Sequence, residues 1–234
     1  MATRISSKSG SSRSVRARSR EATDPPTVIL EAAERLCGER GLEAVSVREI
    51  AAEAGVNLSA INYYFGSRIN LLVTIFKTRV AELDAERRAL LDQQASSPTP
   101  DLREVLRAVL MPLARWRTVQ SNRRAALQFI CRALTTAEPE LKSMIDAGVV
   151  GFRDVIVLLQ RALPHLSFEE LCWRFHFMMS IEHMNFWDVG RLQLLSEGKC
   201  RSDDLNESLE RAVDFAAAGF TAPVRAFDSP PASR

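Results

Sequence analysis

A short uncharged segment, Leu58 to Phe65, carries side chains that can recognise the edges of nucleic-acid bases. Its sequence, LSAINYYF, places Ser59, Asn62 and Tyr63 at spacings that share one face of a helix. An asparagine amide donates and accepts at the same time, which is the bidentate pairing it makes with adenine in a major groove. We therefore expect these residues, together with Leu58, to form a base-reading face with Asn62 as its main specific contact.

Two short helices separated by a turn must position that face. The residues before the turn form an apolar stripe at helical spacing, namely Val47, Ile50, Ala51 and Ala54. Gly55 ends the first helix because glycine adopts the left-handed conformation of a sharp turn. Asn57 can cap the second helix, and Ser46 with Glu49 forms a capping-box pattern before the first. The pattern predicts a helix-turn-helix; the alternative is two such helices in an all-α protein that binds no nucleic acid.

The flanking sequence extends the pattern to three helices and the start of a fourth. Pro25 and Pro26 suit a helix start, Gly41 suits its end, and Ser67 can cap a helix that begins at Arg68. From Ile29 to Leu72 the chain resembles the DNA-binding domain of the TetR family of bacterial transcriptional regulators. The matching residues are Ala32, Ala33, Leu36, Gly41, Ser46, Val47, Ile50, Ala51, Ala54, Gly55, Val56, Ile61, Phe65, Ser67, Leu71 and Leu72.

The resemblance implies a double-stranded DNA operator as partner. The expected DNA-binding residues are Ser46, Arg48, Asn57, Leu58, Ser59, Asn62, Tyr63, Tyr64 and Arg68. The family usually has Tyr at the position of Asn62, often His at Tyr64, and Lys at Arg68. These departures alter the base-reading face, while Arg68 keeps a positive charge at the start of the fourth helix.

The composition bounds the class of protein. Of 234 residues 46% are apolar, which suffices for a core, and the formal net charge of +2 indicates no particular partner. Four widely spaced cysteines without a CxxC pair fit reduced thiols in a cytoplasm. No apolar run reaches the length of a membrane span, the N-terminus has no signal-peptide core, and strand signals are nearly absent. We expect an all-α cytoplasmic protein without membrane contact.

The expected organisation has four parts. Residues 1–23 form a disordered basic arm, residues 24–68 the helix-turn-helix DNA-binding domain, residues 69–222 a helical ligand-binding and dimerisation domain, and residues 223–234 a flexible tail. The arm has no acid before Glu21. It is either a solvated tail or a segment that follows the phosphate backbone or enters a minor groove of DNA.

The body should contain one long helix, from Arg68 to about Gln94, followed by further helices. Their expected ranges are 101–120, 124–135, 138–163, 168–188 and 205–220. A bend is expected near Gly148 and Gly151 in the third of these.

The helix expected at 168–188 is apolar on two sides, so it must be covered on two sides. One side can face its own subunit and the other a twin subunit, as in TetR-like proteins, where two late helices of each subunit build a four-helix interface. Paired half-sites supply the discrimination that one short recognition helix lacks, which favours a homodimer over a helix buried in a monomer. The expected interface residues are Leu171, Phe175, Met178, Leu209 and Val213.

The body resembles TetR ligand-binding domains in architecture and size, which implies a repressor released by a small apolar effector. QFICRALTTAEPEL and the aromatic helix after it resemble the branch whose effectors are fatty acids or acyl-CoA esters. Aromatic and Met side chains could line such a pocket, and the alternative is that they are plain core. The expected lining residues are Met111, Trp116, Phe129, Phe152, Trp173 and Phe177.

Enzymatic chemistry is the weaker interpretation. Cys172, His176 and His183 could share a helix face with Glu169, a spacing that permits a metal site, although core and interface roles suit an apolar helix better. The sequence has no supported nucleophile–histidine–acid set, phosphate loop or carboxylate pair. We expect no catalytic residues, metal or cofactor. The alternatives are a helical metal-dependent enzyme and an adaptor that uses its helix-turn-helix for protein contact.

Overall fold

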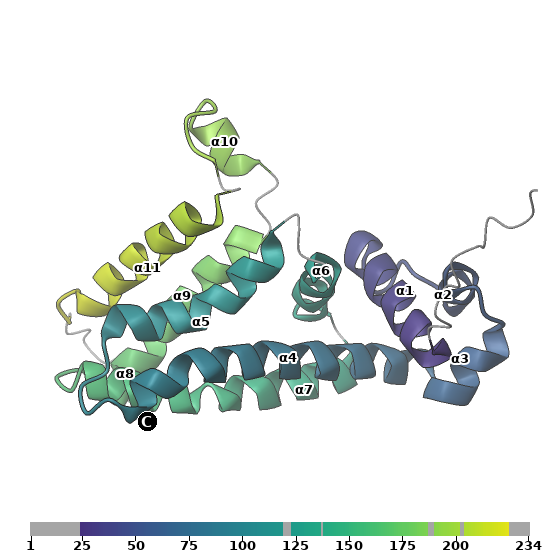
Figure 1. The fold of residues 1–234 in the computed structure, drawn as a ribbon, viewed down its shortest axis with the longest axis horizontal. Helices are drawn as coiled ribbons and strands as arrows, with labels where there is room; N and C mark the ends of the chain where they lie inside the picture. Colours follow the sequence, from purple (N-terminus) through teal and green to yellow (C-terminus); the bar gives the residue numbers. More distant parts are fainter. Residues whose placement is uncertain (1–23, 119–122, 137, 187–189, 202–203, 225–234) are drawn as a thin grey trace, which may run out of the picture.

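The described chain is built from helices alone (Figure 1). The computed structural model describes residues 24–118, 123–136, 138–186, 190–201 and 204–224, and for residues 181–186 it describes only the backbone. No strand occurs in these ranges, so the all-α expectation is confirmed. The predicted basic arm, residues 1–23, and most of the predicted tail, residues 225–234, lie outside the described residues.

The first four helices form one end of the molecule and its long axis (Figure 1). They are α1 (Pro25–Arg40), α2 (Val47–Ala54), α3 (Leu58–Phe65) and α4 (Arg68–Ser96). Ile29, Ile50, Ile61 and Leu72 are fully buried between them. The same core continues to Phe129 in the body, so the hydrophobic packing crosses the boundary between the two expected domains.

The remaining helices pack around the far part of α4. They are α5 (Leu102–Arg117), α6 (Arg124–Ala133), α7 (Pro139–Gly151), α8 (Arg153–Ala162), α9 (Phe168–Phe186), α10 (Arg191–Leu195) and α11 (Leu205–Thr221). A second core joins α5, α8, α9 and α11 to the end of α4. In Figure 1, α7 runs alongside α4, whereas α10 projects away from the body.

Two features of the body differ from the sequence expectation. The segment expected as one bent helix at 138–163 is two helices, because α7 ends at Gly151 and α8 begins at Arg153. Gly148 and Gly151 lower the helix propensity at this point, so a break costs little. The short helix α10 was not expected, since five residues give too short a period to recognise.

The cysteines carry free thiols, and the described helices include no candidate for a membrane span. No disulfide joins the four cysteines, which all lie in described parts of the chain. Burial raises the pKa of the Cys37 thiol to about 11, so this group stays protonated at neutral pH. Within the described ranges, every helix is too short or too polar to cross a bilayer.

Candidate nucleic-acid interface

The first helix of the helix-turn-helix is fixed by its cap. The Ser46 N–H donates to Glu49 Oε2 at 2.8 Å, and the Glu49 N–H donates to Ser46 Oγ at 3.3 Å. Hydrogen bonds from the Ser46 backbone and hydroxyl hold the pKa of the Glu49 carboxyl down to about 2, and Arg40 on α1 adds a bond of 2.8 Å. Gly55 has φ 67° and ψ 29°, the left-handed conformation expected of the turn.

The second helix, α3, presents a polar and aromatic face. The Ala60 N–H and the Ser59 hydroxyl both donate to Asn57 Oδ1, at 2.8 and 2.7 Å, so Asn57 caps the helix as predicted. Ile61 is buried on the inner side, whereas Asn62 and Tyr63 are exposed.

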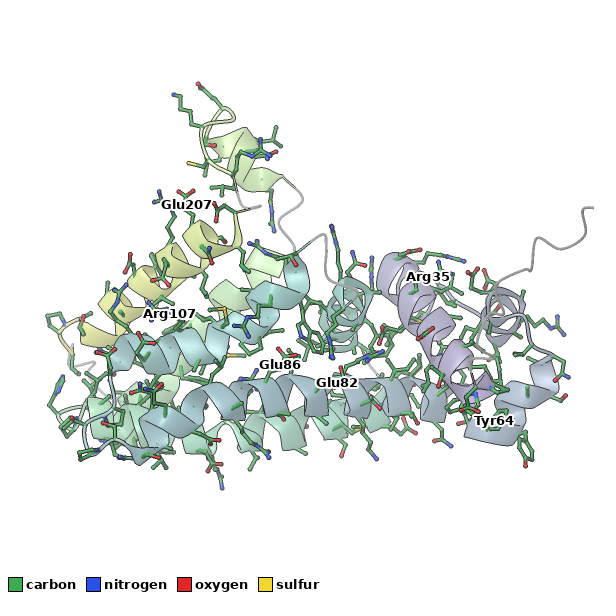
Figure 2. All side chains as sticks on the ribbon, in the orientation of Figure 1. Arg35, Tyr64, Glu82, Glu86, Arg107 and Glu207 are labelled. Atoms are coloured by element: carbon green, nitrogen blue, oxygen red, sulfur yellow. The ribbon has the colours of Figure 1, made fainter. Side chains whose placement is uncertain are left out.

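The exposed face of α3 also includes part of Leu58 and the second tyrosine. The Tyr63 and Tyr64 rings meet edge to face with centroids 5.0 Å apart. Figure 2 shows Tyr64 on α3, at the end of the molecule opposite to α8 and α11. A helix exposed in this way can be laid into a major groove.

Arg68, expected as a DNA contact, makes its hydrogen bonds within the protein, and its contact with DNA stays a prediction. Its side chain is only partly exposed, and its guanidinium donates to the backbone carbonyls of Leu42 and Val45 between α1 and α2. It also lies 3.9 Å from a carboxylate oxygen of Glu138, before α7. Arg68 therefore holds elements together. Arg48, in contrast, is exposed on α2.

The DNA-binding unit is attached to the body through α1 and α6. Arg132 on α6 donates from Nε to the Gly38 carbonyl at 2.8 Å and from Nη2 to the Glu39 carbonyl at 3.0 Å. A Cβ on Gly38 would lie 2.9 Å from the Ala125 carbonyl oxygen, so only glycine allows this approach. This contact was not predicted from the sequence. Its signal was Gly38 inside a helix, where glycine is unfavourable unless packing requires it.

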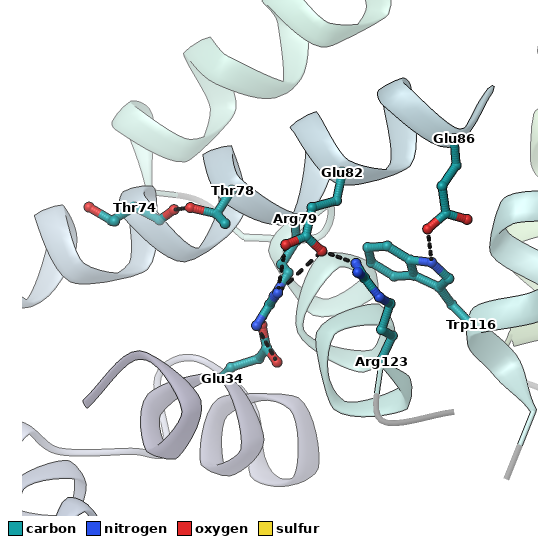
Figure 3. A network of polar contacts seen from close by, with 8 residues as sticks. All are labelled: Glu34, Thr74, Thr78, Arg79, Glu82, Glu86, Trp116 and Arg123. Carbon is teal, nitrogen blue, oxygen red and sulfur yellow. Dashed lines mark hydrogen bonds and ion pairs between the residues drawn. The ribbon is translucent and has the colours of Figure 1, made fainter. Parts of the chain in front are cut away.

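A polar network supports the same junction (Figure 3). Buried Glu34 of α1 lies 2.5 Å from Arg79 of α4, and Arg79 is 2.9 Å from Glu82. Glu82 also accepts from Arg123, which precedes α6. Burial raises the pKa of Glu34 in spite of its bond to Arg79. The network therefore joins α1, α4 and the start of α6 by charge as well as by packing.

Two family models match the chain on either side of this junction. Residues 29–75 match the model described as "Bacterial regulatory proteins, tetR family", and residues 88–219 match "Tetracyclin repressor-like, C-terminal domain". The second match alone spans more than half of the chain. The chain belongs to the TetR family. It is thus a helix-turn-helix transcriptional regulator.

Curated and solved relatives are consistent with this family. Over 70 residues the chain is 34% identical to the "HTH-type transcriptional regulator BetI" of Brucella canis, a match that covers 30% of this chain and about a third (35%) of that relative. The TetR-family regulator PfmR of Thermus thermophilus has 19% identity and a TM-score of 0.59 over 84% of this chain and 99% of its own. The fatty acid degradation regulator FadR of Bacillus halodurans has 16% identity and a TM-score of 0.63 over 87% of this chain and 100% of its own. At these identities the structural matches show the fold.

The body of this TetR-family regulator contains an apolar cavity of about 150 Å³. Its lining comes from α4, α6 and α7, with single contributions from α5, α9 and the α7–α8 junction. The residues are Phe76, Val80, Leu83, Asp84, Arg87, Leu113, Leu127, Ile130, Cys131, Leu134, Met144, Ile145, Gly148, Val149, Phe152 and Met179.

Five of the six expected pocket residues do not line this cavity, and only Phe152 does. Trp116 and Phe129 are buried in the packed core, and the Trp116 Nε1–H donates to Glu86 at 3.0 Å (Figure 3). Met111 packs in the second core. Trp173 and Phe177 are exposed on α9. Periodicity shows that a helix face is apolar, but it does not show whether core, cavity or solvent lies opposite.

The residues expected at the dimer interface are buried within the protomer. Leu171, Phe175, Met178, Leu209 and Val213 all belong to the second core. Helix α9 turns this stripe toward α8 and α11, so within one protomer these side chains already have a cover. Arg107 on α5 also fixes the inner side of α11, donating to both oxygens of Glu210 at 2.8 and 2.7 Å.

On the opposite side of α9, the aromatic side chains among the described residues are exposed. Trp173 and Phe177 are 61% and 58% exposed, and their rings stack with centroids 5.8 Å apart. His176 packs against both rings. On α11, Phe215 is 66% exposed. Trp173, Phe177 and Phe215, the exposed aromatic cluster, therefore lie on the two helices where TetR-like proteins are expected to pair.

The described residues do not support the metal-site alternative. No group of three or more His, Cys, Asp and Glu side chains among them could hold a metal ion. The side chain of His183, one member of the expected set, lies outside the described residues.

Proposed function

We propose that this TetR-family regulator is a homodimeric repressor that a small apolar effector releases from its double-stranded DNA operator. One observation carries the proposal: the cavity is lined mainly by α4 and α6, together with α7. Helix α4 follows α3 directly, and α6 binds α1 through Arg132. A ligand that prefers one arrangement of α4 and α6 therefore also changes the position of α3.

The operator contacts in this proposal come from α2 and α3. Asn62, Tyr63 and Leu58 would meet base edges, and Arg48 would meet a phosphate. Ser46, Asn57, Ser59 and Tyr64 complete the surface, the first three mainly by shaping the helix starts. Arg68 stays a predicted contact, although its guanidinium is bonded to the loop between α1 and α2.

The second subunit would cover the aromatic cluster of α9 and α11. Burying Trp173, Phe177 and Phe215 removes large apolar surfaces from water, which supports association. Two copies paired in this way would present two α3 helices to successive turns of the major groove, about 34–36 Å apart. Effector binding would spread the two helices away from that spacing.

The cavity supports a compact effector. A cavity of about 150 Å³ holds a ligand of about the size of a benzene ring. An acyl-CoA ester is far larger than this cavity, so the cavity supports a small apolar effector better than an acyl-CoA ester. Binding of such a molecule to a gene regulator would take place in the cytoplasm, where the operator is.

The test is a protection experiment with the full-length protein and DNA from upstream of its own gene. We expect two protected half-sites about 34–36 Å apart, with affinity that falls steeply as salt rises. Expression of a reporter placed behind the protected DNA should increase when the regulator gene is deleted. Absence of protection, or binding without salt dependence, would contradict the proposed regulation through DNA. A fall in reporter expression on deletion would show that the protein activates transcription and does not repress it.

A further inference from the structure

One charged side chain reaches the wall of the otherwise apolar cavity with part of its hydrogen-bonding capacity unused. Arg87 on α4 is 7% exposed and lines the cavity. Its Nη1 donates to Asp84 Oδ1 at 2.5 Å, and its Nε has no hydrogen-bond partner among the described residues. Leaving a buried donor unbonded is costly, so such a group indicates a partner that binds there.

The guanidinium is oriented by two contacts. Its carbon lies 4.7 Å from the centre of the Phe152 ring, so one face of the plane is covered. Asp84 occupies Nη1. In a planar guanidinium the Nε–H points along the same edge as one N–H of Nη2. The Nε atom is closed to solvent in this arrangement. Once the side chain turns toward the cavity, this edge can donate to a single acceptor oxygen of a ligand.

The charges around Arg87 are already balanced. Among the cavity-lining residues the only ionised side chains are Asp84 and Arg87, which form an ion pair. A smaller pocket of about 50 Å³ shares Asp84, Arg87 and Phe152, and adds Arg88 and Asp154, whose charges also cancel. A carboxylate on the ligand would compete with Asp84 for the same cation and would add an uncompensated negative charge beside the buried Arg87 side chain.

We propose that the effector is a compact, uncharged molecule with an apolar body and one hydrogen-bond-accepting oxygen, such as a ketone, aldehyde or ester, which binds the Nε edge of Arg87. This inference rests on the proposed ligand-responsive function and specifies its ligand. The apolar body lies among Leu83, Leu127 and Ile130, and the oxygen lies toward the α7–α8 junction at Phe152.

Three probes of similar shape test whether the site prefers an uncharged accepting oxygen: acetophenone, ethylbenzene and benzoate. Calorimetric titration of the full-length protein without DNA, at pH 7, gives the dissociation constant of each. We expect acetophenone to bind at least about tenfold more tightly than ethylbenzene, because a hydrogen bond to a charged donor contributes that much. Benzoate should bind more weakly than acetophenone.

Two variants assign the preference to Arg87. Arg87→Met keeps an unbranched side chain of similar length and should reduce the ratio of acetophenone to ethylbenzene affinity to about one. Asp84→Asn leaves the Arg87 cation uncompensated and should strengthen benzoate binding about tenfold. Arg115→Met, at an exposed position of α5, is the matched control and should leave all three constants unchanged.

Several results would overturn the inference: equal binding of acetophenone and ethylbenzene, tighter binding of benzoate to the wild-type protein, or a ratio unchanged by Arg87→Met. Absence of binding by all three probes would overturn it as well. If circular dichroism shows that Arg87→Met does not fold, two measurements still test the inference. They are the ratios of probe affinities in the wild-type protein and the gain in benzoate binding in Asp84→Asn. Operator protection is measured separately from probe binding. If the probes show no preference for an accepting oxygen, the regulatory proposal still stands, and if no operator is protected, the ratios of probe affinities are unaffected.

Discussion

Asn62 is the residue on which base recognition depends in the proposed interface. Its amide is exposed on α3, and an amide can pair with a base through a donor and an acceptor at once. Asn62→Ala should therefore reduce operator affinity by about 1–3 kcal/mol and leave binding to random DNA nearly unchanged. Fluorescence anisotropy with both DNAs measures the two effects. Asn206→Ala, at an exposed position of α11, is the control; equal losses on both DNAs would remove Asn62 from the base contacts.

Glu49 links the stability of α2 to pH. Its pKa is about 2 in the folded protein and 4.5 ordinarily. A lowered pKa stabilises the fold above about pH 4.5, and this contribution disappears as the pH falls from 4.5 toward 2. Glu49→Gln can still cap α2 but cannot ionise. The wild type should melt at a higher temperature than this variant at pH 7, and the two melting curves should converge below pH 4.5. A constant difference across this range would show that the charge of Glu49 contributes nothing.

Single residues were predictable where the backbone alone decides their role. Ser46, Gly55 and Asn57 have the capping and turn geometry that their types predict, because caps depend on neighbours within one helical turn. The hydrogen bonds of Arg68 were not predicted, because its side chain reaches carbonyls more than twenty residues away. A one-dimensional pattern contains no information on such long-range partners.

At the level of elements, the contact between α1 and α6 decides how the DNA-binding unit sits on the body. Gly38→Ala places a methyl group 2.9 Å from the Ala125 carbonyl and 3.2 Å from Gln128 Cβ, so the helices must separate. We expect a loss of about 1–3 kcal/mol in the free energy of unfolding, measured by urea titration. Gly148→Ala, where an added Cβ meets nothing within 4 Å, should instead stabilise the protein slightly. Equal effects would mean that α1 does not pack this closely on α6.

The exposed aromatic cluster leads to a second prediction at the level of helices, which concerns the interface between subunits. Trp173→Glu places an unpaired charge in the proposed interface between subunits, at a cost of several kcal/mol, while the protomer core is untouched. Sedimentation velocity should show folded monomers, and operator affinity should collapse. Val157→Glu on α8, where the valine is 57% exposed, is the matched control and should stay dimeric. A dimeric Trp173→Glu protein would place the interface on another surface.

Helices as elements were predictable from apolar spacing, but their orientation was not. Both stripes of α9 are apolar, so the spacing could not tell which stripe faces the core. The structure buries Leu171 and Phe175 within the protomer and exposes Trp173. Orientation depends on which neighbouring helix fills the space, here α8 and α11 for the buried stripe. The location of the cavity was missed for the same reason.

For the whole molecule, the charge distribution in the DNA-binding unit is unfavourable for phosphate contact. Residues 21–65 contain more acids than bases, with only Arg35, Arg40 and Arg48 as cations. Arg35 pairs with Glu53, and Arg40 lies 2.8 Å from Glu49. Arg68 is bonded to backbone carbonyls. Arg48 is the remaining exposed cation of the described unit, so most of the attraction to DNA must arise elsewhere.

The segment that can supply this attraction is residues 1–20, which contain Arg4, Lys8, Arg13, Arg16, Arg18 and Arg20 and no acid. Cations that contact phosphates release counterions, and each lost contact reduces the slope of log affinity against log salt by about 0.9. Deleting residues 1–20 should weaken binding to operator and random DNA alike and make that slope shallower, with unfolding and dimerisation unchanged. A variant with the six cations replaced by Gln separates charge from length, and it should behave like the deletion. An unchanged affinity and salt slope in both proteins would show that the arm takes no part in binding and that the body itself supplies the phosphate contacts.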